Sequence, residues 1–193
     1  MAKASAAPAT IAIVCGLGNP DADYERTRHN AGFATVDVLA ARHGVRYWKS
    51  EAGAQVASLT WRGADGEQRE VLLAKPMSYM NTSGGPLSKL TRAHRVAPQQ
   101  ILVVHDEVDL AAGEVRLKLG GGLNAHNGLR SIADKLGSRD FARVQFGIGR
   151  PPGKMQVADY VLRELKGGFL DEFNITAERA ANLVERILTE GAK

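Results

Sequence analysis

Ile101-Leu102-Val103-Val104-His105-Asp106-Glu107 decides the fold, because an unbroken apolar run passes directly into three polar residues. Short continuous apolar runs are typical of buried strands. Asp106 should then emerge at the carboxyl end of its strand, which is the edge where the loops of an α/β sheet gather functional side chains. The stretch therefore predicts a buried strand with a polar site at its end.

The rest of the chain predicts helices and further strands around this one. Two apolar runs on either side of the turn Gly63-Ala64-Asp65-Gly66 are typical of an antiparallel pair, whereas helices between other strands indicate crossovers. We predict strands at residues 11–15, 56–61, 70–74, 101–104, 115–119 and 143–148, and helices at residues 31–43, 85–95, 127–136 and 171–189. This pattern indicates the α/β class, with a single three-layer domain in which helices flank a mixed β-sheet.

Length and composition favour one globular domain. With 193 residues, the chain can bury a hydrophobic core without disulfides or structural metals, and we expect residues 11–193 to form one domain. Residues 1–10 are rich in alanine and precede no small-residue cleavage site, so we expect a flexible N-terminal tail rather than a signal peptide. Cys15 is the only cysteine, and no apolar run reaches the ~18 residues of a membrane span. We therefore expect a cytoplasmic protein with no membrane partner.

Positive charge is concentrated in one part of the chain. Residues 113–154 contain eight basic and three acidic residues, so the net charge of this segment is +5. The whole chain has a net charge of +4, so the remainder is close to neutral. Such a distribution favours a polyanionic partner such as a nucleic acid. The alternative is a solvated surface that happens to be rich in lysine and arginine.

Four polar segments offer the chemistry of a hydrolase. These segments are residues 18–30, 79–81, 105–107 and 126–129. They include the imidazole of His29, the carboxylate of Asp106 and the carboxamides of Asn19, Asn81 and Asn127. A neutral imidazole can take a proton from water near pH 7, and Asp106 could fix its tautomer and stabilise the imidazolium. Each residue alone could be ordinary, as a capping histidine, a turn aspartate or a loop asparagine. Their occurrence together, at the ends of separate elements, favours one catalytic cleft.

Two other kinds of site fit the sequence poorly. Gly16-Leu17-Gly18 resembles the start of a dinucleotide-binding loop, but Asp21 stands where the third glycine is needed, and its carboxylate would face the pyrophosphate. His105, Asp106, Glu107 and Asp109 could suggest a metal centre, but successive residues of a strand point to opposite faces. We therefore expect neither a nicotinamide cofactor nor a metal.

A series of short motifs runs in order through roughly residues 11–165. They are Gly16-Leu17-Gly18-Asn19-Pro20, Tyr24, Thr27-Arg28-His29-Asn30-Ala31-Gly32, Lys75-Pro76, Tyr79-Met80-Asn81, Ser83-Gly84, His105-Asp106-Glu107-Val108-Asp109-Leu110, Arg116-Leu117-Lys118-Leu119-Gly120-Gly121-Gly122, His126-Asn127-Gly128-Leu129-Arg130 and Gly147-Ile148-Gly149-Arg150-Pro151. Taken together, these motifs resemble the bacterial peptidyl-tRNA hydrolase family.

This resemblance implies hydrolysis of the ester that joins a peptide to tRNA, which recycles tRNA from stalled translation, by a monomer without a cofactor. It implies that His29 is the general base, that Asp106 holds it in its basic form, and that Asn19 distinguishes a blocked amine from a free one. The peptide and the 3′ end of the tRNA would contact Asn19, Tyr24, Tyr79, Met80, Asn81 and Asn127. The rest of the tRNA would contact Arg116, Lys118, His126 and Arg130.

Three positions depart from the family pattern, although none is the proposed base or its carboxylate. Asp21 replaces a usual glycine in the loop that leads to His29. Gly122-Leu123-Asn124-Ala125 replaces a glycine-rich run, so a mobile gate over the cleft could be stiffer. Gln145 stands where some members carry a tRNA-binding arginine, and Arg139 and Arg143 are nearby in sequence. The main functional alternative is a non-catalytic RNA-binding protein on the same scaffold, which would have no need of a base.

Overall fold

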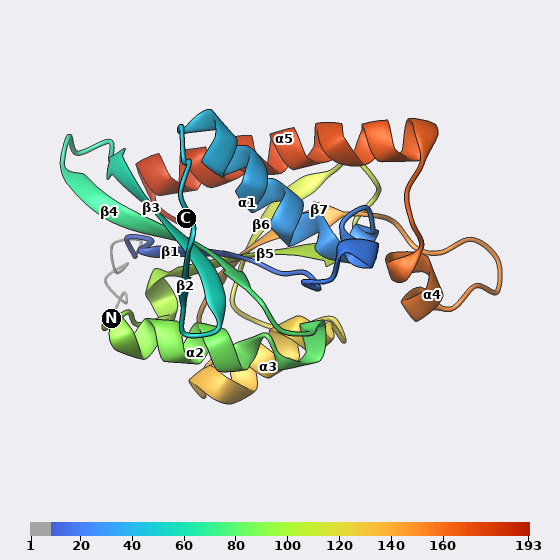
Figure 1. Ribbon diagram of the computed structural model, residues 1–193, viewed down its shortest axis with the longest axis horizontal. Coiled ribbons are helices and arrows are strands. Elements are labelled where there is room, and N and C mark those ends of the chain that lie inside the picture. Colours follow the sequence, from blue (N-terminus) through green and yellow to red (C-terminus); the bar gives the residue numbers. More distant parts are fainter. Residues whose placement is uncertain (1–8) are drawn as a thin grey trace, which may run out of the picture.

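The computed structural model describes residues 9–193, so the expected N-terminal tail lies outside the described residues except for its last two positions. One seven-stranded sheet in the order β2-β3-β4-β1-β5-β7-β6 runs through the molecule (Figure 1). Its strands are β1 (Ile13–Gly16), β2 (Lys49–Glu51), β3 (Ala54–Arg62), β4 (Gln68–Pro76), β5 (Ile101–Glu107), β6 (Val115–Leu119) and β7 (Ala142–Gly147).

The sheet is mixed, as the sequence predicted. β1 lies in the centre and runs parallel to β4 and β5, and β5 runs parallel to β7. The two ends of the sheet are antiparallel, with β2-β3-β4 at one end and β6-β7 at the other. The carboxyl ends of β1, β4, β5 and β7 therefore meet at one edge of the sheet, where the polar segments follow them.

Helices cover both faces, which confirms the three-layer α/β fold. α1 (Ala31–Arg42) and α5 (Gly167–Glu190) lie on one face, and α2 (Gly84–Ala93) and α3 (Asn127–Leu136) lie on the other (Figure 1). The short helix α4 (Val157–Leu162) packs against the turn that precedes α1. None of the helices described for residues 9–193 is long and apolar enough to cross a membrane.

Strand β5 shows how the two cores are filled. Ile101 and Val103 pack in the cluster below α2 and α3, whereas Leu102 and Val104 pack in the cluster below α1 and α5. This alternation continues into the polar end of the strand, so His105 and Asp106 point to opposite faces. The fully buried Cys15 of β1 belongs to the first cluster, and burial raises the pKa of its thiol to about 12.

Gly32 allows α1 to approach the sheet closely. A Cβ atom at Gly32 would lie 2.2 Å from the backbone nitrogen of Leu17 and 2.3 Å from the carbonyl oxygen of Val104. No side chain fits in that space, so the start of α1 lies directly on β1 and β5. The single turn of 3₁₀-helix Arg28–Asn30, which immediately precedes α1, is thereby brought to the carboxyl end of β5.

Several predicted boundaries were wrong. β5 continues through His105, Asp106 and Glu107, because these three buried residues still pair with residues 145–147 of β7. α5 begins at Gly167 rather than Asp171. β2 and α4 were not predicted, since three and six residues are too short for a clear period. Asn30 makes no side-chain cap on α1 and bonds to Asn19 instead.

Candidate active site

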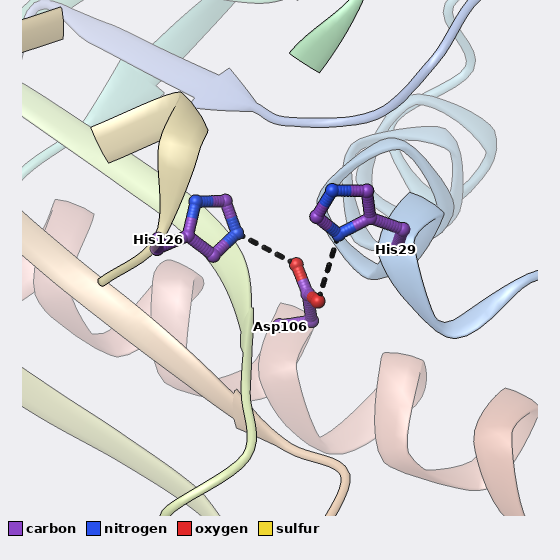
Figure 2. A group of neighbouring side chains, drawn as sticks. All are labelled: His29, Asp106 and His126. Carbon is purple, nitrogen blue, oxygen red and sulfur yellow. Dashed lines mark hydrogen bonds and ion pairs between the residues drawn. The ribbon is translucent and has the colours of Figure 1, made fainter. Parts of the chain in front are cut away.

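His29 and His126 flank the carboxylate of Asp106 (Figure 2). The Nδ1 atom of His29 lies 2.9 Å from Oδ2 of Asp106, and the Nε2 atom of His126 lies 2.8 Å from Oδ1. His29 comes from the turn before α1, Asp106 from β5 and His126 from the start of α3. The predicted pairing of His29 with Asp106 is present, and a second imidazole shares the same carboxylate.

The contacts of His126 define its tautomer. His126 is the N-terminal cap of α3, and its Nδ1 accepts hydrogen bonds from the backbone N–H groups of Gly128 (3.1 Å) and Leu129 (3.3 Å). Nδ1 must therefore carry a lone pair, so the ring proton lies on Nε2, which donates it to Asp106. The imidazole thus connects the helix terminus to the carboxylate.

The hydrogen bond with Asp106 orients His29 for base chemistry. Burial on its own lowers the pKa of His29, but the negative charge of Asp106 and its hydrogen bond outweigh burial, so the pKa is raised above 6.5. Burial on its own raises the pKa of Asp106, whereas the charges and hydrogen bonds of the two histidines hold it well below its usual range. Asp106 is therefore a carboxylate that accepts the Nδ1 proton of His29, and Nε2 of His29 keeps its lone pair.

His105 lies behind this group in the core. Its side chain is fully buried, its Nδ1 donates to the carbonyl oxygen of Asp106 at 2.8 Å, and its ring stands edge-on to His126 at 5.1 Å between centroids. Burial, followed by the proximity of His126, lowers the pKa of His105 to about 3. A neutral His105 therefore packs below the site without taking part in the pairing.

A groove of about 620 Å³ opens beside these side chains. Its polar wall includes His29, Asp106 and the exposed Asn127, the first residue of α3. Its opposite wall is apolar and comes from α4, with Val157 and Leu162 partly exposed. The groove can therefore hold a substrate with a polar, backbone-like group next to an imidazole base and an apolar part against α4.

Asn19 connects the loop after β1 to two neighbouring segments. Its Oδ1 accepts from the backbone N–H of Met80 at 2.8 Å. The backbone N–H of Asn19 donates to Oδ1 of Asn30, and Nδ2 of Asn30 donates back to the carbonyl oxygen of Asn19. The structure thus brings Asn19 and Met80 together as predicted. The side chain of Met80 is buried against Gly128, so it supports the start of α3 from below.

The predicted substrate contacts Tyr24 and Tyr79 lie near the loop after β1, which contains Asp21, the first of the three departures from the family pattern. Tyr79 is 58% exposed, and its hydroxyl donates to the carboxylate of Asp21 at 3.2 Å. Tyr24 is half-buried in the short 3₁₀ turn Ala22–Tyr24, and Asn81 is exposed in the turn Met80–Thr82. Asp21 therefore ties the loop after β1 to an aromatic side chain, which a glycine could not do.

The predicted tRNA contacts divide into two groups. Arg116 and Lys118 lie on the edge strand β6, where Arg116 is exposed and Lys118 donates to the carbonyl oxygen of Gly122. Arg130 lies on α3 and lines a hollow of about 720 Å³ together with Arg139. His126 lines the groove, and its two ring nitrogens bond to Asp106 and to the start of α3.

Gln145, the third departure from the family pattern, and its neighbour Arg143 are both buried. Gln145 is 7% exposed, and its amide donates to Glu107. Arg143 is fully buried, and its guanidinium donates to the carbonyl oxygens of Gly120 and Gly122 at 3.0 and 2.9 Å. Arg143 therefore cannot supply the arginine contact that is missing at position 145, because its guanidinium holds a loop. Among the two nearby arginines, Arg139 remains accessible.

The sequence did not reveal the roles of three residues that build the site, although His126 was expected there as a tRNA contact. Asn30 aligns Asn19, His126 shares the carboxylate of Asp106, and Glu107 binds Asn124 and Gln145. Asn30 and Glu107 adjoin His29 and Asp106 in the motifs, which was an available signal. The role of His126 had no comparable signal, because it depends on where α3 begins relative to the end of β5.

His29, Asp106 and His126 also have the spacing of a metal site, with one ligand atom of each within 4.8 Å of the others. The tautomer of His126 argues against that use. A metal on Nε2 would move the ring proton to Nδ1, where the N–H groups of Gly128 and Leu129 already point. The donor set fits a doubly hydrogen-bonded carboxylate better than a metal centre.

Comparison with known proteins agrees with this geometry. The pattern of the family described as peptidyl-tRNA hydrolase matches residues 13–193. Relatives named peptidyl-tRNA hydrolase are 48% identical in Frankia alni, over 93% of this chain and 88% of the relative, and 49% identical in Nocardia farcinica, over 93% and 91%. A crystal structure of peptidyl-tRNA hydrolase from Acinetobacter baumannii has a TM-score of 0.82 at 34% identity, covering 92% of this chain and 88% of that chain. The chain belongs to the peptidyl-tRNA hydrolase family.

Proposed function

We propose that this protein hydrolyses the ester bond between peptide and tRNA in peptidyl-tRNA, with His29 as the general base. The observation that carries this proposal is the 2.9 Å hydrogen bond between Nδ1 of His29 and Asp106 at the wall of an open groove. It leaves Nε2 of His29 as the proton acceptor, in the tautomer that base catalysis needs. Recycling of tRNA from stalled or aborted translation is the corresponding physiological role.

The reaction needs one water molecule and one transferred proton. Nε2 of His29 accepts a proton as the water oxygen attacks the ester carbonyl carbon, and Asp106 stabilises the imidazolium that forms. The tetrahedral intermediate then collapses, the bond to the ribose oxygen breaks, and the imidazolium returns the proton to that oxygen. The exposed amide of Asn127 beside the groove can donate a hydrogen bond to the developing oxyanion.

The substrate is recognised in two parts. We assign the peptide and the 3′ end of the tRNA to Asn127 in the groove and to the accessible side chains of Tyr24, Tyr79 and Asn81. Asn19 and Met80 are buried, and we assign them to the support of these segments. Amide side chains suit a substrate that is selected by its peptide backbone. We assign the phosphates of the tRNA to Arg116, Lys118 and Arg130, to which the accessible Arg139 is added.

We assign His126 to the support of Asp106 rather than to tRNA. A carboxylate that accepts one hydrogen bond on each oxygen has a defined orientation, and His126 supplies the second of these bonds. The mechanism uses no cofactor and no metal, because the imidazole base, the carboxylate and the amides are sufficient for ester hydrolysis. We also propose that the protein acts as a monomer in the cytoplasm, where tRNA is used in translation, and that residues 11–193 act as one domain.

The test is release of peptide from tRNA by the purified protein in the presence of a chelator. N-acetyl-aminoacyl-tRNA should be hydrolysed and free aminoacyl-tRNA should not. His29→Ala should lower kcat by about 10²–10⁴-fold, which is the usual contribution of a general base, and leave the Kd for tRNA within about twofold. His43→Ala is the matched control, because His43 pairs with Glu185 on another part of the surface.

Two results would refute parts of this proposal. Full activity of His29→Ala would remove His29 from the mechanism. A wild-type protein that binds tRNA tightly but releases no peptide would instead favour the non-catalytic RNA-binding alternative.

A further inference from the structure

We propose that Glu107 is a positioning residue for the reaction, which holds residues 120–125 against the groove by binding the side chain of Asn124. This inference rests on the proposed function, since the groove is taken as the substrate site. It concerns a carboxylate that the mechanism above does not use.

Glu107 is the last residue of β5 and is 3% exposed. Its Oε1 accepts from the backbone N–H of Asp109 at 3.0 Å. Its Oε2 accepts from Nδ2 of Asn124 at 3.0 Å and from Nε2 of Gln145 at 3.3 Å. Both oxygens are thus occupied by amide donors, and one of these donors comes from an exposed loop. Glu107 therefore links the sheet to the wall of the groove.

The loop has a backbone conformation that needs an external contact. Asn124 and Ala125 have φ angles of +48° and +59°, in the left-handed region that alanine disfavours and that asparagine tolerates better than most residues. Such a conformation persists when surrounding contacts determine it. The amide of Asn124 supplies such a contact, and a glycine at this position could not.

The other end of the loop is held separately. The buried guanidinium of Arg143 donates to the carbonyl oxygens of Gly120 and Gly122, so the first half of the loop is fixed to β7. The bond between Asn124 and Glu107 fixes the second half to β5. His126 and Asn127 follow directly, and together with Asn124 they line the groove. Loss of the contact with Glu107 should therefore loosen this wall and widen the groove, while the hydrogen bond between His29 and Asp106 stays intact.

Asn124→Gly is the principal test variant. Glycine accepts the same φ without strain, so this change removes the amide and little else. Ala125→Gly is the matched control, because it relaxes the adjacent left-handed residue and keeps the amide of Asn124. For N-acetyl-aminoacyl-tRNA we expect Asn124→Gly to raise KM about tenfold, the effect of losing one hydrogen bond to a charged group, and to leave kcat within about twofold. Ala125→Gly should change KM by less than about threefold.

Variants of Glu107 test the same contact from the other side. Glu107→Ala should raise KM at least as much as Asn124→Gly does, and adding Asn124→Gly to it should have no further effect, because the contact between the two side chains is already lost. Glu107→Gln should stay close to wild type, since the amides of Asn124 and Gln145 can turn their oxygens towards its NH₂ group. Amide hydrogen exchange over residues 123–126 should accelerate in Asn124→Gly and Glu107→Ala but not in Glu107→Gln.

The outcomes separate this inference from the proposed function. If wild type releases no peptide, the function fails, and hydrogen exchange alone still tests the contact. In an active protein, an unchanged KM in Asn124→Gly would overturn the inference. An effect of the same size in Ala125→Gly, or a loss confined to kcat, would also overturn it. If Glu107→Ala does not fold, Asn124→Gly still decides, because Asn124 is exposed.

Discussion

The carboxylate of Asp106 does more than orient a neighbour, because its charge determines how basic His29 is. Burial lowers the pKa of His29, and only the charge and hydrogen bond of Asp106 raise it above 6.5. Asparagine at position 106 would remove the charge, and its NH₂ group could donate to Nδ1 of His29. The ring proton would then move to Nε2, where it blocks base catalysis.

We therefore predict that Asp106→Asn lowers kcat/KM by about 10²-fold or more. Because the base must be deprotonated to act, the acid limb of the pH profile follows the pKa of His29 in the free enzyme. Without the anion this pKa falls, so the acid limb should move to lower pH. The measurement is kcat/KM for N-acetyl-aminoacyl-tRNA from about pH 5 to about pH 9, roughly two pH units either side of neutrality, which spans the titration of a histidine. An unchanged profile would contradict the pairing.

The pKa of His105 is shifted in the opposite direction to that of His29, because His105 is fully buried and stays neutral. Its pKa is lowered to about 3, so between pH 6.5 and 3 the unfolded chain binds a proton at this residue and the folded chain does not. Stability should therefore fall as pH falls through this window, by at most about 1.4 kcal/mol per pH unit from this residue. Urea unfolding at several pH values should show a shallower acid loss for His105→Asn than for wild type. Parallel curves would show that His105 carries no such linkage.

At the scale of elements, the approach of α1 to the sheet determines whether His29 meets Asp106. Gly32→Ala would place a Cβ atom 2.2 Å from Leu17 and 2.3 Å from Val104, in backbone that cannot move aside without shifting the helix. We predict a loss of about 1–3 kcal/mol in the free energy of unfolding and a lower kcat, because the turn that carries His29 moves with α1.

Gly85→Ala provides the control for this variant. Gly85 lies in α2, and a Cβ atom there would have no heavy atom within 4 Å. Alanine is the better helix former by about 1 kcal/mol, so this variant should be neutral or more stable. Denaturant unfolding and turnover measured on both proteins test the comparison. If Gly32→Ala behaved as Gly85→Ala does, the close approach would have no energetic significance.

The elements show why part of the site was predictable. The apolar run of β5 and the turn before α1 both end in polar residues at a sheet edge, so the pairing of His29 with Asp106 followed from local pattern. Arg143 did not follow, since a basic residue in a strand is usually solvated and here bonds to the carbonyl oxygens of Gly120 and Gly122. Local periodicity cannot show where a distant loop turns its carbonyl groups. The same applies to Asn124, whose partner Glu107 is 17 residues away in sequence.

For the molecule as a whole, only part of the positive charge of residues 113–154 is available to a partner. Arg143 is buried, Arg150 pairs with Asp109, and Lys118 donates to a carbonyl oxygen of the loop. Arg116, Arg130 and Arg139 are accessible and remain the main candidates for phosphate contacts. Net charge alone therefore overstates the positive surface that a tRNA would meet.

We predict that Arg116→Ala combined with Arg130→Ala raises KM for peptidyl-tRNA and flattens its salt dependence. Each lost phosphate contact should reduce the slope of log affinity against log salt concentration by about 0.7–0.9, because fewer counterions are released on binding. Arg46→Ala combined with Arg186→Ala removes the same charge from exposed positions after α1 and on α5, on the opposite face of the sheet from α3, and should leave the slope unchanged. Both slopes are measured by titrating tRNA binding at salt concentrations from about 50 to about 200 mM, a range in which phosphate contacts dominate the salt dependence. Equal slopes in the two double variants would place the tRNA on another surface, whereas a difference confined to the first variant would locate it along β6 and α3.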